Sequence, residues 1–227
     1  MAVKKSEAEV LEIKPIIKRT ISVRIVGDTP LIVHKWSKKA KQEMLDKQMK
    51  KTKTAARKAK DPFEDFVTSA YWMTDEPTEF TPEAFKAAVE NGARWGFPVT
   101  SIKQAAIMAS SRNETGLKGT ALKGSFFFAG EGTDRLAEVK GVVPVMREDM
   151  VRVGGISKTA DIRYRAEFPV GWYMDLLMDY NANGPFTVEQ IINLINLGGF
   201  SVGIGEWRPE RDGDYGMFHV AAQGEVI

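Results

Sequence analysis

Apolar and polar residues alternate in two segments near opposite ends of the chain. In the segment 18–26, Ile21, Val23 and Ile25 are separated by polar residues, and the segment 171–180 alternates in the same way. Successive side chains of a strand point to opposite faces, so this period predicts strands with one face toward a core. Turn-forming residues follow each segment and end the predicted strands.

Apolar residues at helical spacing predict two core helices, at 101–111 and 187–197. Thr187 and Gln190 have the spacing of a capping box for the second helix, and the pair Gly198-Gly199 is expected to end it. Two more helix starts are indicated by a capping residue followed by proline: Asp61-Pro62 and Thr81-Pro82.

Short apolar runs predict three further strands, at 125–129, 142–146 and 217–221. The segment 146–165 differs from these runs. It contains five arginines and lysines, has little apolar content and is interrupted by Gly154-Gly155. Such a segment is typical of an extended hairpin that leaves a sheet.

The order of these elements is strand, helix, strand, strand, helix, strand. This βαββαβ order predicts an α+β protein with a ferredoxin-like core and long insertions. A length of 227 residues suits one elaborated domain. We therefore expect a flexible lead-in at 1–17 and a single domain at 18–227, with a basic helical insertion at about 35–80 and the hairpin at about 146–165.

Positive charge is concentrated in one stretch of a nearly neutral chain. Between Lys35 and Lys60 lie eleven basic and two acidic residues, a local charge of +9, whereas the whole chain carries +2. A block of this kind can attract a polyanion in a salt-sensitive way. The alternative is a solvated lysine-rich helix.

A glycine-rich segment with two arginines lies between the second core helix and the last strand, at 198–216. Because glycine has no side chain, the backbone there can approach a phosphate closely. The alternative is a demanding turn packed under the sheet, with Trp207 as a core anchor. A dinucleotide-binding loop is excluded by context, since these glycines follow a helix and lead into a strand.

This glycine-rich loop after the second helix of a βαββαβ core resembles the RAMP superfamily, which includes the backbone subunits of CRISPR surveillance complexes. The segments 29–48 and 202–218 are also similar to proteins of tailed bacteriophages. The resemblance implies a loop near the second helix, a thumb hairpin at 146–165 that grips a single strand, and subunits stacked in a filament. It places the loop at Gly203, Gly205, Arg208, Gly213 and Gly216, and basic thumb residues at Arg147, Arg152, Lys158, Arg163 and Arg165.

The sequence therefore predicts non-catalytic, largely sequence-independent binding of single-stranded DNA or RNA by a homo-oligomer. It would serve phage recombination, replication, or a CRISPR-like or counter-defence process. Trp36 and Tyr164 lie beside basic residues and are candidates for stacking on unpaired bases. The expected contact residues are Lys35, Trp36, Lys38, Lys39, Lys50, Lys51, Lys53, Arg147, Arg152, Lys158, Arg163, Tyr164, Arg165, Gly203, Gly205 and Arg208.

Two alternatives remain open. One is a phage protein-interaction module that binds and inhibits a host complex. The other, weaker one is a RAMP-type ribonuclease centred on His34, one of two histidines in the chain. Neither histidine has a partner at metal-ligand spacing, so we expect no metal and no cofactor. The absence of cysteine and of a long apolar run favours the cytoplasm, which is the bacterial host's if the protein is phage-encoded, and no membrane contact.

Overall fold

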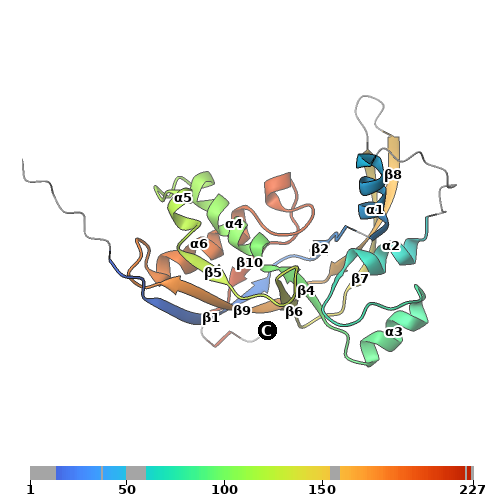
Figure 1. The fold of residues 1–227 in the computed structure, drawn as a ribbon, viewed down its shortest axis with the longest axis horizontal. Coiled ribbons are helices and arrows are strands. Elements are labelled where there is room, and N and C mark those ends of the chain that lie inside the picture. The colour runs from blue at the N-terminus through green and yellow to red at the C-terminus, as the bar shows by residue number, and fades with distance from the viewer. Residues whose placement is uncertain (1–13, 37, 50–59, 154–158, 223, 226–227) are drawn as a thin grey trace, which may run out of the picture.

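The computed structural model describes residues 14–36, 38–49, 60–153, 159–222 and 224–225. The chain is an α+β protein built from antiparallel sheets (Figure 1). Most of the expected lead-in lies outside the described residues. Among the helices that are described, none is long and apolar enough to cross a bilayer.

A four-stranded sheet forms the centre of the fold, in the order β10-β1-β9-β5, with every neighbouring pair antiparallel. Its strands are β1 (Lys18–Gly27), β5 (Phe126–Phe128), β9 (Tyr173–Asn181) and β10 (Phe218–Val220). The two predicted long strands, β1 and β9, are paired from Lys18 opposite Asn181 to Val26 opposite Tyr173. Their alternation reflects a sheet with one face on the core.

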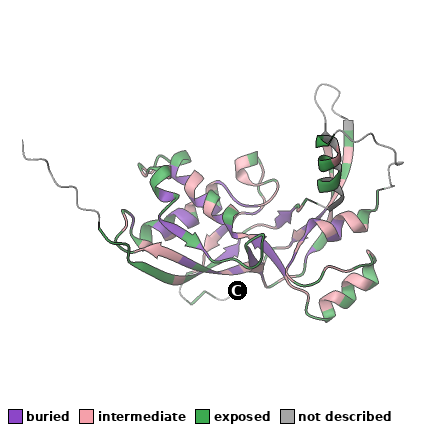
Figure 2. Cartoon of the chain, viewed as in Figure 1, coloured by how far each residue is buried: buried purple, intermediate pink, exposed green. Residues whose placement is uncertain are grey.

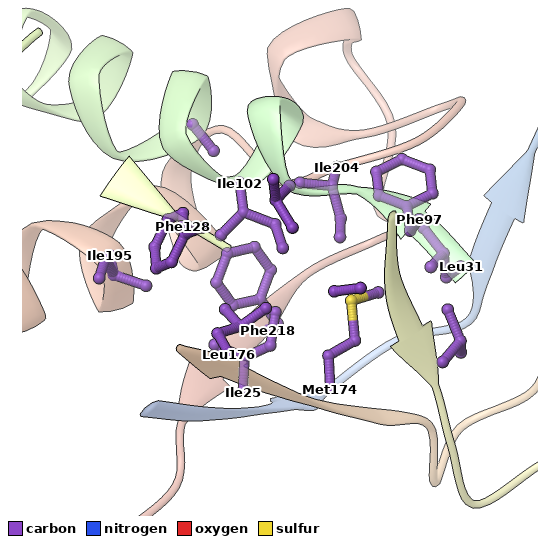
Figure 3. Close-up of a cluster of buried hydrophobic side chains, with 14 of the residues drawn as sticks. Ile25, Leu31, Phe97, Ile102, Phe128, Met174, Leu176, Ile195, Ile204 and Phe218 are labelled. Carbon is purple, nitrogen blue, oxygen red and sulfur yellow. The ribbon is translucent and has the colours of Figure 1, made fainter. Parts of the chain in front are cut away.

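Helices α4 (Val99–Arg112) and α6 (Val188–Ser201) pack against each other over one face of this sheet, and the short α5 (Gly119–Leu122) follows α4 (Figure 1). Figure 3 shows Ile25 and Leu176 of the sheet meeting Ile102 and Ile195 of the helices. These side chains are at most 1% exposed. Burying each of them stabilises the fold by about 1.5–3 kcal/mol.

The predicted end of α6 at Gly198-Gly199 is wrong, because the helix continues to Ser201. A Cβ at Gly198 would lie 2.7 Å from the Ala106 nitrogen of α4, and one at Gly199 would overlap the carbonyl of Phe218. The two glycines therefore permit close packing of α6 on α4 and β10, and they do not act as a helix stop.

A second sheet has the order β2-β8-β7 and carries the predicted hairpin. Its strands are β2 (Leu31–Val33), β7 (Val145–Val153) and β8 (Thr159–Phe168). We call β7 and β8 the arm. The strand predicted at 142–146 is misplaced, since β7 begins at Val145. Pro144 directly precedes it and has no N–H to donate to a ladder.

The basic insertion contains more than a projecting helix. Helix α1 (Lys38–Gln48) is largely exposed (Figure 2), but α2 (Pro62–Ser69) packs on β8 and buries Phe66 and Val67. A third sheet that the sequence did not predict has the order β3-β4-β6. It consists of β3 (Tyr71–Trp72), β4 (Trp95–Pro98) and β6 (Leu136–Val139), with α3 (Pro82–Glu90) between β3 and β4.

Candidate nucleic-acid interface

A cavity of about 470 Å³ lies beside α2, the helix that packs on the arm. Trp36 lines it together with Lys35 and with Lys41 of α1. The rest of the lining comes from α2, from the loop after β3 and from the turn before β6. Its remaining lining residues are Glu64, Thr68, Glu76, Pro77, Thr78, Phe80 and Asp134.

The linker after β2 places an aromatic and a basic side chain at this cavity. The backbone N–H of Lys35 donates to the carbonyl of Ser69 at 2.8 Å, which fixes the linker against the end of α2. The Lys35 ammonium lies 5.7 Å from the centre of the Tyr71 ring. Trp36, one residue further on, is 56% exposed. Its ring is therefore available to a ligand and is not part of the core.

Charges of both signs line the cavity. Lys35 and Lys41 share the lining of the cavity with three carboxylates, those of Glu64, Glu76 and Asp134. The backbone places Lys38 and Lys39 in the first turn of α1. The predicted contact residues Lys50, Lys51 and Lys53 lie outside the described residues. The positive side of the cavity is thus the side formed by the linker and α1.

Arg165, expected to face a bound strand, is instead buried, with 2% of its side chain exposed. It lies on the face of the arm that turns inward, where its Nη1 is 3.4 Å from Oδ2 of Asp149. Its Nε has no hydrogen-bond partner in the described structure. Burial lowers the pKa of this guanidinium. The prediction that Arg165 grips nucleic acid is wrong, because a strand cannot reach it in this conformation.

Arg147, on the same face, is also held by the protein. It donates to Asp149 at 2.9 Å and to Glu167 at 2.6 Å, and its guanidinium lies 4.5 Å from the centre of the Tyr215 ring. Two of its five donors are used in these hydrogen bonds, and the Tyr215 ring contacts the guanidinium. Arg147 therefore links the arm to the loop before β10 and is held in place by the protein.

The remaining arm residues differ in their exposure and in the contacts that they make with the rest of the protein. Arg163 is about one-third exposed and lies 3.9 Å from Asp161, a long and weak pair. Arg152 is exposed, and within the described residues it contacts no carboxylate. Tyr164 packs against the core and lies opposite Glu148 in the hairpin, and partial burial together with this carboxylate raises its pKa. Lys158 lies outside the described residues. On the arm, Arg152 and Arg163 are the cations a strand can reach.

The glycine-rich loop is packed against the protein rather than open as a phosphate cradle. A Cβ at Gly205 would overlap the carbonyl of Ile32, and one at Gly203 would lie 2.7 Å from Pro209. Both glycines have positive φ, +78° and +69°. Arg208 donates to the carbonyl of Gly205 at 2.8 Å and pairs with Glu210 at 2.6 Å. The loop therefore has a structural role.

In the alternative interpretation of this loop Trp207 anchors it in the core, but the Trp207 side chain is 42% exposed. Its backbone has φ of +53°, in the left-handed region. The Trp207 carbonyl accepts from the N–H of Tyr215 at 3.1 Å. The backbone of this residue, and not its ring, closes the turn, which includes the short 3₁₀ helix η1 (Pro209–Arg211).

The two histidines occupy separate surroundings. His34 is exposed to solvent, but partial desolvation by the groups around its ring, reinforced by the positive charge of Arg165, lowers its pKa. His219 lies 2.6 Å from Asp28 and 2.8 Å from Glu225. No group of three His, Asp or Glu side chains in the described part of the chain could hold a metal ion.

Compared with known proteins, the chain matches no family model, and no curated protein is detectably similar to it. The candidate site therefore rests on geometry alone. Sequence reasoning identified Lys35 and Trp36 but missed the acidic wall of the cavity. Asp134 is about one hundred residues away from them in the chain, and no local pattern connects the two segments.

Proposed function

We propose that this protein binds single-stranded nucleic acid without catalysing a reaction on it. The observation that carries the proposal is the position of Trp36. Its exposed ring borders a cavity of about 470 Å³ together with Lys35 and Lys41. An aromatic ring between lysines can stack on an unpaired base while the lysines attract the flanking phosphates.

The carboxylates of the cavity restrict how a strand could lie. Phosphates are repelled by Glu76 and Asp134, so the backbone would follow the linker and α1, on the side of Lys35 and Lys41. A base would then point into the cavity.

The arrangement of the central sheet supports a ferredoxin-like, RAMP-like core as part of the proposal. The elements β1, α4, β5, β9, α6 and β10 follow the βαββαβ order. The strands lie in the order β10-β1-β9-β5, with β1 and β9 in the middle, and both helices cover one face. In this interpretation the arm corresponds to the thumb, with Arg152 and Arg163 as its reachable cations.

The proposal is tested by titrating labelled single-stranded oligonucleotides of several sequences, as DNA and RNA, with the full chain at increasing salt. We expect weakening with salt and little dependence on sequence. In Lys35→Ala with Lys41→Ala the slope of log K against log salt should fall by up to about two. The matched control, Lys86→Ala with Lys118→Ala, removes two exposed lysines elsewhere and should leave the slope unchanged. No binding at low salt would overturn the proposal.

A second candidate is a protein-interaction module. The observation that favours it is the apolar surface of α1 and the residue after it: Met44 and Leu45 of the helix are 45% and 46% exposed, and Met49, just beyond its end, is 57% exposed. Exposed apolar side chains gathered on one helix suit a protein partner. This candidate predicts no affinity for oligonucleotides even at low salt, so the same titration separates the two functions.

A further inference from the structure

Strand β7 has an outer edge that nothing in the described structure covers. The strand is nine residues long and has β8 as its neighbour on one side. Within the described residues, the backbone of β7 makes no hydrogen bonds outside the hairpin. The other edge of the arm is occupied, because β2 pairs with the base of β8 and Lys60 donates to the carbonyl of Ile162. An uncovered edge of this length is a template for another strand.

The direction of the free backbone groups follows from the hydrogen bonds of β8. The N–H of Ala166 donates to Ser69, and the carbonyl of Ile162 accepts from Lys60, so both residues direct these groups away from β7. In an antiparallel pair, the residue opposite an outward-directed residue also faces outward. Met150 lies opposite Ile162 in the register. Met150 and its even-numbered neighbours Glu148 and Arg152 therefore present free N–H and C=O groups at the edge.

The side chains of these three residues are exposed. Met150 is 78% exposed, and its cross-strand neighbour Ile162 is 43% exposed, which leaves an apolar spot near the middle of the arm. Glu148 and Arg152 stand on either side of Met150 on the same face of the strand. An acidic and a basic residue placed symmetrically about an apolar one form a self-complementary pattern.

We propose that the β7 edge pairs antiparallel with the β7 edge of a second copy of this chain, with Met150 on the two-fold axis. In this register Met150 faces its own copy, while Glu148 faces the second copy's Arg152 and Arg152 faces its Glu148. Each of these three pairs exchanges two backbone hydrogen bonds. The two arms join into one continuous sheet.

Charge selects this register over its neighbours. A two-fold axis that passes through any residue of β7, even- or odd-numbered, brings the free backbone groups of the two copies together, so the charges decide between these centres. A centre at Glu148 places that carboxylate against itself, and a centre at Arg152 places two guanidinium groups together. Like charges directly opposite each other destabilise a strand pair, and opposite charges contribute about 0.2–1 kcal/mol. A centre at Asp149 places that carboxylate against itself, and a centre at Val151 leaves Arg152 opposite Met150. Only the centre at Met150 pairs Glu148 with Arg152.

This inference is independent of nucleic-acid binding, so its test uses the full chain without any ligand. Sedimentation of the parent chain should show a dimer whose fraction rises with concentration. Glu148→Arg and Arg152→Glu should each raise the dimer dissociation constant by about tenfold or more, because two attractive pairs become repulsive. The double variant, Glu148→Arg with Arg152→Glu, restores opposite charges and should restore the dimer.

Two control variants match these changes in charge. Glu90→Arg and Lys86→Glu alter an exposed pair on α3 by the same amounts and should leave the dimer intact. Melting temperatures show whether each variant is folded. A monomeric parent chain, or single variants that dimerise as well as the parent, would overturn the inference.

A cross-link provides a second readout. The chain contains no cysteine, so Met150→Cys introduces a single thiol. Paired residues on the axis have Cα atoms about 5.5 Å apart, within the range of a disulfide. Mild oxidation should therefore produce a covalent dimer with Met150→Cys but not with Ile162→Cys, which lies one strand further from the axis. Equal cross-linking of both variants would contradict the register.

Discussion

Arg165 and Asp149 form an ion pair inside the base of the arm, with Nη1 and Oδ2 3.4 Å apart. The side chain of Arg165 is 2% exposed and that of Asp149 is 10% exposed. Asp149 also accepts from Arg147 at 2.9 Å, whereas Arg165 has no closer carboxylate within the described residues. Asp149 therefore keeps an ion-pair partner if Arg165 is replaced, whereas Arg165 loses its partner if Asp149 is replaced.

This inequality predicts opposite outcomes for two substitutions. Asp149→Ala should lower the free energy of unfolding by up to about 3–5 kcal/mol, because the buried Arg165 loses its ion-pair partner and keeps only the longer-range attraction of Glu206. Arg165→Met should be nearly neutral or stabilising, since Asp149 keeps Arg147 and an apolar side chain fills the space. Urea denaturation measures both. Equal losses in the two variants would contradict this account.

Trp36 is predicted to contribute to binding and not to folding. Trp36→Ala should raise the dissociation constant for single-stranded oligonucleotides by about 5- to 150-fold, corresponding to about 1–3 kcal/mol of stacking. Its melting temperature should stay that of the parent, because the side chain is 56% exposed. Phe200→Ala is a suitable control, since Phe200 is 69% exposed on α6. A similar loss in both variants would mean that Trp36 has no specific role.

The two histidines should give stability opposite dependences on pH. Partial burial disfavours the charged form of His219, but its hydrogen bonds to Glu225 and Asp28 outweigh this effect and raise its pKa above the usual 6.5. The contribution of His219 to the free energy of unfolding is therefore complete below about pH 6.5 and is lost as pH rises through the raised pKa. The pKa of His34 is lowered, so its contribution to the free energy of unfolding is present above about pH 6.5 and is lost as pH falls.

Melting temperatures between about pH 5 and pH 9 test this pair of effects. His219→Gln should reduce the loss of stability on the alkaline side. His34→Gln should reduce the loss on the acid side. If both substitutions changed the pH profile in the same direction, at least one of the two pKa directions would be incorrect.

We expect alanine at position 199 to destabilise the protein, although alanine usually stabilises a helix interior relative to glycine. Alanine normally stabilises a helix interior by about 1 kcal/mol relative to glycine. At Gly199 the added Cβ would overlap the carbonyl of Phe218, so Gly199→Ala should destabilise the protein by separating α6 from β10. Gly124→Ala is the control, because no atom lies within 4 Å of its Cβ position. A stable Gly199→Ala variant would show that α6 can shift without cost.

The sequence predicted those elements whose signal is local. Alternation revealed β1 and β9 because one face of the sheet carries polar residues, and the capping box of Thr187 and Gln190 is present in the structure. The third sheet escaped detection, since β4 is a four-residue strand in which Trp95, Gly96 and Phe97 are all buried and no alternation remains.

The candidate site was predictable only in part, for a different reason. Five basic residues of the arm look equivalent in the sequence, yet the packing of α2 and of the loop before β10 decides which face of the hairpin turns inward. That packing buries Arg165 and leaves Arg152 exposed. Likewise, Lys35 and Asp134 share a cavity through tertiary contacts that no spacing rule connects.

The pairing of β1 with β9 has a consequence for how the chain is made. Lys18 lies opposite Asn181, so the strand that pairs with β1 is synthesised about 150 residues later in the chain. At about 5–20 residues per second, a ribosome leaves β1 without this neighbour for roughly 8–30 seconds. During that interval Val23 and Ile25 lack the neighbours that bury them, and the nascent chain is open to aggregation or to a chaperone. Sheet closure over so long a loop also makes refolding slow, on the order of milliseconds to seconds.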